Sequence, residues 1–183
     1  MTQSHNGFDS QTMSALLRLH ESARNLADVL FEQQLRVVFA ESCTCGMCAA
    51  ALGQVPGISA HLSGSAVTYR PQVKMDWLNV DPAEIAEFTT ESAEITAAMA
   101  RGVLQSTSDP QVSAATTGHL GPVENAAIDG RIFITIAQRT MDGISVLHEA
   151  SAKLSTNSRA ARQAEAATRV LTELCVALVS SRS

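Results

Sequence analysis

Apolar residues recur at spacings of three and four over residues 9–34, the pattern of an amphipathic helix that packs through one face. A mostly apolar run at residues 35–40 follows it and is typical of a buried strand. A helical pattern starts soon after that run and ends at Val55-Pro56-Gly57. Residues 157–180 set alanines and leucines at alternating steps of four and three, which predicts a second long helix with a core-facing stripe.

The middle of the chain alternates between strand and helix patterns. Strands are expected at 62–69, 111–116, 131–137 and 144–151, and shorter helices from Pro71, from Asp81-Pro82 and over 91–105. The early strands are separated by helices, whereas residues 131–151 look like adjacent strands joined by Met141-Asp-Gly143. We therefore predict an α/β fold, a three-layer α/β/α sandwich with a mixed, mostly parallel sheet.

Length and charge narrow the classes of function. A chain of 183 residues that is 45% hydrophobic predicts one domain over residues 1–183, with residues 1–14 as a flexible N-terminal lead. The formal charge of −5 and the absence of a dense basic run argue against a nucleic-acid partner. No apolar stretch suits a membrane helix and the polar start is unlike a signal peptide, so we expect a cytoplasmic protein without membrane partners.

Candidate chemistry gathers around the turn after the first strand. Ser42 and Thr44 lie at the start of a helix, where free N–H groups can hold an anion or stabilise an oxyanion. Tyr69 and Lys74 follow the second strand and supply groups that help to deprotonate a serine. A lysine with an ordinary pKa near 10.4 is protonated, so Lys74 must be desolvated or lie near positive charge to act as a base. These residues predict a hydrolase.

Six short segments keep their order and spacing between residues 15 and 180: Ala40-Glu-Ser-Cys-Thr-Cys-Gly46, Val55-Pro-Gly57, Gly64-Ser-Ala-Val-Thr-Tyr69, Lys74-Met-Asp-Trp-Leu78, Ala98-Met-Ala-Arg-Gly102 and Thr117-Gly-His-Leu-Gly-Pro122. Together they resemble the CinA C-terminal domain family, whose active members are nicotinamide mononucleotide deamidases. The resemblance implies an α/β/α fold and hydrolysis of the nicotinamide amide to nicotinic acid mononucleotide and ammonia. It implies no metal or cofactor, and relatives that often assemble suggest a homo-oligomer.

In this interpretation Ser42 is the nucleophile, and Lys74 with Tyr69 accepts its proton. The substrate is expected to contact Glu41, Thr44, Cys45, Gly46, Thr117, Gly118, Arg159 and Arg162. The two arginines lie three residues apart in the first turns of the last helix, so both can point at one phosphate, and the family has a similar pair there. Each contact also has a structural alternative: a helix cap, a surface salt bridge, a tight turn or a solvated arginine.

The chain departs from the family pattern at three places. Cys45 stands where the family has a glycine, and a left-handed backbone there makes a side chain cost on the order of 1 to 2 kcal/mol. His119-Leu120 replaces an apolar pair, and Arg70-Pro71 replaces Ser-Asn after the tyrosine. These departures leave open a nucleotide-binding pseudoenzyme of the same fold.

The cysteines offer a third alternative. Cys45-Gly-Met-Cys48 at a strand-to-helix junction resembles a thioredoxin dithiol, although Thr44 stands where that family has tryptophan and no matching cis-proline segment follows. A metal site built from Cys43, Cys45 and Cys48 lacks the two separated knuckles of a structural zinc site. We therefore expect reduced thiols without metal.

Overall fold

The computed structural model describes residues 9–121, 123 and 125–181. In chain order its elements are α1 (Ser10–Gln33), β1 (Val37–Glu41), α2 (Met47–Leu52), the 3-10 helix η1 (Ile58–Ala60), β2 (Leu62–Val67), α3 (Pro71–Leu78), α4 (Pro82–Phe88), α5 (Ala93–Ser106), β3 (Val112–Gly118), β4 (Arg131–Thr140), β5 (Gly143–Lys153) and α6 (Arg159–Ser180). Each element expected from the sequence is present, with ends shifted by a few residues.

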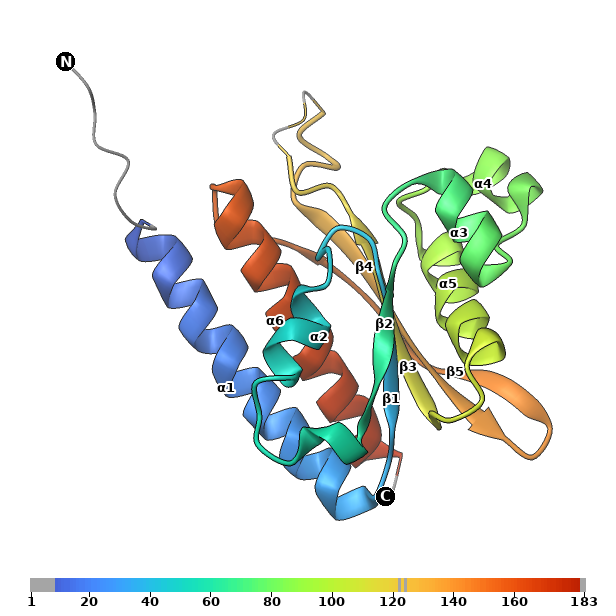
Figure 1. Cartoon of the computed structure of the whole chain (residues 1–183). Coiled ribbons are helices and arrows are strands. Elements are labelled where there is room, and N and C mark those ends of the chain that lie inside the picture. Colours follow the sequence, from blue (N-terminus) through green and yellow to red (C-terminus); the bar gives the residue numbers. More distant parts are fainter. Residues whose placement is uncertain (1–8, 122, 124, 182–183) are drawn as a thin grey trace.

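The described strands form one mixed sheet in the order β2-β1-β3-β4-β5. Strand β1 pairs in parallel with β2 and β3, and β4 is antiparallel to β3 and to β5. Four strands therefore run in one direction and β4 runs in the other. Helices α1, α2 and α6 cover one face, and α3, α4 and α5 cover the other (Figure 1). The predicted three-layer α/β/α architecture is confirmed.

The core lies in two layers because both faces of the sheet are covered. Phe39 of β1 belongs to the cluster under α1 and α6, whereas its neighbours Val38 and Ala40 belong to the cluster under α5. This two-sided burial explains why β1 is an apolar run without alternation. Among the described helices, none has the length and apolar character needed to cross a membrane.

The N-terminal helix begins earlier than the predicted flexible lead allows. Asp9 caps α1 by accepting a 2.6 Å hydrogen bond from the backbone N–H of Thr12. Residues 10–14 are therefore helical, and the prediction of a lead through residue 14 is wrong for this part. Residues 1–8 of that lead lie outside the described residues.

The topology places the ends of three parallel strands at one edge of the sheet. Glu41, the last residue of β1, pairs with Val67 of β2 and with Thr116 of β3. The residues that follow these strands therefore meet where α/β sheets commonly bind ligands. Ser42 follows β1, Tyr69 follows β2, and Gly118 ends β3.

Candidate active site

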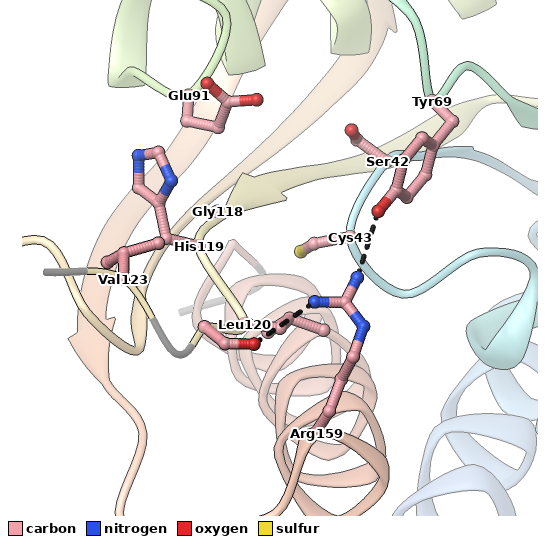
Figure 2. A pocket seen from close by; sticks show the side chains of 10 residues that line it. Ser42, Cys43, Tyr69, Glu91, Gly118, His119, Leu120, Val123 and Arg159 are labelled. Atoms are coloured by element: carbon pink, nitrogen blue, oxygen red, sulfur yellow. Dashed lines mark hydrogen bonds between the residues drawn. The ribbon is translucent and has the colours of Figure 1, made fainter.

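A cavity of about 250 Å³ opens at this edge of the sheet. Figure 2 shows its walls, which come from the turns after β1, β2 and β3, from the segment before α5 and from the start of α6. Its lining residues are Ser42, Cys43, Tyr69, Glu91, Gly118, His119, Leu120, Gly121, Val123 and Arg159. The sequence predicted four of these as site residues: Ser42, Tyr69, Gly118 and Arg159.

Ser42 and Lys74 meet beside this cavity. The Lys74 Nζ atom donates a 3.0 Å hydrogen bond to Ser42 Oγ and a 2.6 Å hydrogen bond to the carbonyl oxygen of Thr68. Lys74 is fully buried and Ser42 is 5% exposed. Helix α3, which starts at Pro71, carries the lysine from the end of β2 back toward the end of β1.

Burial changes the protonation of Lys74. Desolvation lowers the pKa of its amine from 10.5 to about 8, although the negative charge of Glu91 partly opposes this change. With such a pKa, roughly a tenth of the lysine is neutral at pH 7 and about half at pH 8. The structure thus supplies the desolvation that a lysine base requires.

Glu41 organises the turn that carries the serine. Its buried carboxylate accepts hydrogen bonds from Thr44 Oγ1 (2.7 Å), Gly46 N (2.9 Å), Cys48 N (3.1 Å), Ala49 N (3.1 Å) and Ser65 Oγ (2.9 Å). The free N–H groups at the start of α2 are therefore saturated from inside the protein.

This arrangement overturns part of the predicted substrate-binding set. The N–H of Gly46 and the hydroxyl of Thr44 are bound to Glu41, and the N–H of Cys45 donates to the Ser42 carbonyl at 3.2 Å. The prediction that these donors face a substrate is wrong, because a carboxylate of the same chain already occupies them. Glu41, Thr44, Cys45 and Gly46 shape the turn that presents Ser42.

The last two residues of β3, Thr117 and Gly118, have different roles. Thr117 is fully buried, and its Oγ1 lies 2.8 Å from Thr96 Oγ1, so it joins β3 to α5 and does not line the cavity. Gly118 does line it. A β-carbon at Gly118 would lie 2.6 Å from the backbone oxygen of Arg131, so no side chain fits there. Of these two predicted contacts, Gly118 lies in the cavity wall, and the prediction is wrong for the buried Thr117.

Arg159 reaches the cavity from the first turn of α6. Its guanidinium donates to the Tyr69 hydroxyl at 2.9 Å and to the Gly121 carbonyl at 3.4 Å (Figure 2). Tyr69 is 52% exposed, and this bond directs its hydroxyl toward the arginine. The structure thus gives Tyr69 a different partner from the expected one, Lys74, and makes it a neighbour of the candidate phosphate-binding residue.

Arg162 has a structural role instead. It forms two hydrogen bonds with the Asp129 carboxylate, at 2.8 and 2.7 Å, and it also donates to the Thr156 and Leu120 carbonyls. These bonds with Arg162 hold the pKa of Asp129 below its usual range. The guanidinium is committed to fixing the loop that follows β3, so the predicted phosphate clamp of two arginines is wrong for Arg162.

Comparison with known proteins agrees with this architecture. The model of the CinA C-terminal domain matches residues 19–175. The chain belongs to the CinA C-terminal domain family. A CinA-like protein of Endomicrobium trichonymphae is 36% identical over 117 residues, covering 64% of this chain and 25% of that protein. A CinA-like protein of Chlorobaculum tepidum is 37% identical over 120 residues, covering 64% of this chain and 28% of that protein.

The matched region thus spans about a quarter of the length of these two CinA-like relatives. A solved structure of a competence/damage-inducible protein from Agrobacterium tumefaciens has 28% sequence identity and a TM-score of 0.79, and the match covers 88% of this chain and 96% of that chain. The family match over residues 19–175 includes the turn after β1 and the cavity edge of the sheet.

Two departures from the CinA pattern take different places in the structure. Cys45 has a left-handed backbone with φ of 54°, as its replacement of a glycine suggested, but its side chain is exposed and does not line the cavity. His119 does line the cavity. The chemistry of the pocket therefore differs from the family pattern at His119 rather than at Cys45.

Sequence reasoning marked His119 as a change in the pocket but missed Glu91 as a cavity residue of this CinA domain. Glu91 immediately precedes Ser92, the N-cap of α5, and its carboxylate accepts a 2.5 Å hydrogen bond from Thr90 Oγ1. In sequence it looked like part of a helix start. Its place in the fold could have revealed Glu91, because α5 begins at the same edge of the sheet as Ser42.

Burial holds two thiols of this CinA domain in the protonated form. Burial, with a contribution from Glu41, raises the pKa of the Cys48 thiol well above its ordinary value, and burial raises the pKa of Cys43 to about 11. Neither of these two sulfurs therefore has the lowered pKa of a reactive thiolate. Over the described part of the chain, no three side chains of His, Cys, Asp or Glu lie together as a metal site.

Proposed function

We propose that this protein is an amidohydrolase that converts nicotinamide mononucleotide to nicotinic acid mononucleotide and ammonia, with Ser42 as its nucleophile. One observation carries the proposal: the Lys74 amine lies 3.0 Å from the Ser42 hydroxyl and has a pKa of about 8. A serine beside a partly neutral lysine, at the wall of a cavity, is suited to attack an amide carbonyl. Membership of the CinA family supports this reaction class.

The first half of the reaction makes an acyl-enzyme. Neutral Lys74 accepts the Ser42 proton while Oγ bonds to the amide carbon, which gives a tetrahedral oxyanion. The carbon–nitrogen bond then breaks, the Lys74 ammonium returns its proton to the leaving nitrogen, and ammonia departs. The Thr68 carbonyl holds the lysine in place during both transfers, because it accepts a 2.6 Å hydrogen bond from Nζ.

Hydrolysis of the ester completes the cycle. Lys74, neutral again after ammonia leaves, accepts a proton from water as the water oxygen attacks the ester carbon. The carbon–oxygen bond to Ser42 breaks, the Lys74 ammonium returns its proton to the serine oxygen, and the carboxylic acid formed releases its proton to solvent as nicotinate. Base and nucleophile thus act in both halves, and no redox step occurs.

The phosphate of the nucleotide has one candidate partner in the described cavity wall. Arg159 is exposed at its mouth, with Tyr69 and the Gly121 carbonyl orienting the guanidinium. An oriented guanidinium matches the geometry of a phosphate group. Arg159 therefore supports binding of a phosphorylated substrate.

Ammonia release from nicotinamide mononucleotide by the purified protein tests the proposal. We expect Ser42→Ala and Lys74→Ala each to reduce the rate at least about a thousandfold. Cys45→Ser is the matched control near the serine and should retain the wild-type rate. Binding of the nucleotide without ammonia release would identify a pseudoenzyme. Loss of activity only in Cys45 or Cys48 variants would indicate thiol chemistry instead.

A further inference from the structure

The described lining of the cavity contains two side chains of opposite formal charge. Arg159 lies at one wall and Glu91 at another, and Figure 2 shows them well apart, with Ser42 on a third side. A ligand that fills this space meets a cation near one part and an anion near another. Such a field favours a molecule that carries both charges with the matching separation.

The charge of Glu91 is felt at the catalytic groups. Glu91 opposes the lowering of the Lys74 pKa, so its charge acts at the amine that contacts Ser42. Its carboxylate is partly buried, and the hydrogen bond from Thr90 helps to hold it at the start of α5. A charged ring bound between Glu91 and Ser42 would interact with this carboxylate under weak solvent screening.

Resting on the proposed function, we propose that Glu91 is a specificity-determining residue that selects substrates whose amide is carried by a positively charged ring, an N-alkylated pyridinium. Nicotinamide mononucleotide is such a molecule, with its cationic ring suited to Glu91 and its phosphate suited to Arg159. An uncharged ring of the same shape lacks the first interaction. Hydrolysis also creates a carboxylate on the ring, and its repulsion by Glu91 favours product release.

A purely structural role for Glu91 makes a different prediction. If Glu91 served only to tune Lys74 or to support the start of α5, its loss would affect all ligands of the cavity alike. The charge of the ligand ring is therefore the variable to change. The reduced form, dihydronicotinamide mononucleotide, has nearly the same shape and the same phosphate but an uncharged ring.

Binding is measured by calorimetry in the Ser42→Ala protein, with both nucleotides. We expect Glu91→Gln to weaken binding of the cationic nucleotide roughly tenfold and binding of the reduced nucleotide less than about twofold. Glu94→Gln is the matched control, because Glu94 is an exposed acid in the first turn of α5 and does not line this cavity. It should change neither Kd.

The outcomes separate the two proposals. Equal weakening of both nucleotides, or no weakening of the cationic one, overturns the role of Glu91 while wild-type ammonia release still stands. Absence of ammonia release by the wild-type protein, together with no binding of either nucleotide, overturns the proposed function and this inference with it. Selective weakening of the cationic nucleotide supports the role of Glu91 whether or not turnover is observed.

Discussion

The amine of Lys74 lies 3.0 Å from the hydroxyl of Ser42, although the two residues are 32 positions apart in the chain. Two short segments bring them together: the turn after β1, held by Glu41, and the first turns of α3. The Thr68 carbonyl fixes the lysine from the other side. The topology of parallel strands thus brings the proposed nucleophile and its proposed base together, and their closeness has measurable consequences.

The pH dependence of ammonia release should follow Lys74. Its pKa of about 8 means that the amine is mostly an ammonium below this pH and cannot accept the serine proton. We expect kcat/KM to rise about tenfold per pH unit below pH 8 and to level off above it. Initial rates over a pH series test this, and a profile that is flat or falls with increasing pH would contradict it.

Glu91 should set the midpoint of that profile. Because its negative charge raises the Lys74 pKa against the effect of burial, Glu91→Gln is expected to move the midpoint of kcat/KM to lower pH. Glu94→Gln should leave the midpoint unchanged. An unchanged or higher midpoint in the Glu91 variant would show that its charge does not reach the lysine.

Lys74 should also make stability depend on pH. Its folded pKa of about 8 lies below its ordinary 10.5, so the unfolded chain binds more protons between these values and the free energy of unfolding rises with pH there. Below pH 8 the lysine costs on the order of 3 kcal/mol. Lys74→Met removes this cost but leaves the Thr68 carbonyl without its donor.

The stability difference between Lys74→Met and the wild-type protein is therefore the quantity to measure. The free energy of unfolding of the methionine variant, relative to that of the wild-type protein, should be higher at about pH 7 than at about pH 10. Only the wild-type protein recovers the cost of the buried lysine as pH rises. Urea unfolding at both pH values checks this, and other titrating groups cancel in the difference. A gap independent of pH would show that Lys74 has an ordinary pKa.

Glu41→Gln should destabilise the turn that presents Ser42. Its carboxylate accepts five hydrogen bonds, three of them from backbone N–H groups at the start of α2. An amide has the same shape but turns an N–H toward these donors, so we expect a loss of roughly 2 to 4 kcal/mol in the free energy of unfolding. Denaturant unfolding measures this, with the exposed Glu94→Gln as control, and equal stability of the two variants would refute it.

Of the two arginines in the first turns of α6, Arg159 should affect nucleotide binding and Arg162 should affect stability. Arg159→Ala is expected to weaken nicotinamide mononucleotide binding far more than binding of the dephosphorylated riboside, with little change in stability. Arg162→Ala should instead lower the free energy of unfolding, because Asp129 loses its partner and the loop after β3 loses the bonds that hold it. Calorimetry and urea unfolding of both variants test this, and equal losses for nucleotide and riboside would exclude a phosphate contact at Arg159.

The sequence was informative where a local pattern decides the outcome. The apolar periodicity over residues 9–34 and 157–180 and the uninterrupted run before Ser42 were sufficient for the elements and their layers. The meeting of Ser42 with Lys74 followed from motifs in register, since both follow parallel strands that are neighbours in the sheet.

The direction of individual polar side chains could not be read in the same way. Arg159 and Arg162 look equivalent in sequence. The difference between them depends on Asp129, which lies 33 residues before Arg162 in the chain and binds only Arg162 of the two. Glu41 was expected to contact the substrate or to close a surface salt bridge, because nothing local shows that α2 folds back over its carboxylate. Tertiary contacts, rather than propensity, decide such cases.

Cys45 offers a test of backbone strain without loss of function. Its φ of 54° is a left-handed conformation in which a β-carbon is unfavourable, and its side chain is exposed outside the cavity. Cys45→Gly should therefore raise the free energy of unfolding by about 0.5 to 1 kcal/mol, after the greater flexibility of unfolded glycine is subtracted. Cys45→Ala keeps the β-carbon and should bring no gain, so the difference between the two variants in urea unfolding isolates the backbone effect. Ammonia release should be the same in both, and equal stability of the glycine and alanine variants would show that the turn accommodates a side chain without strain.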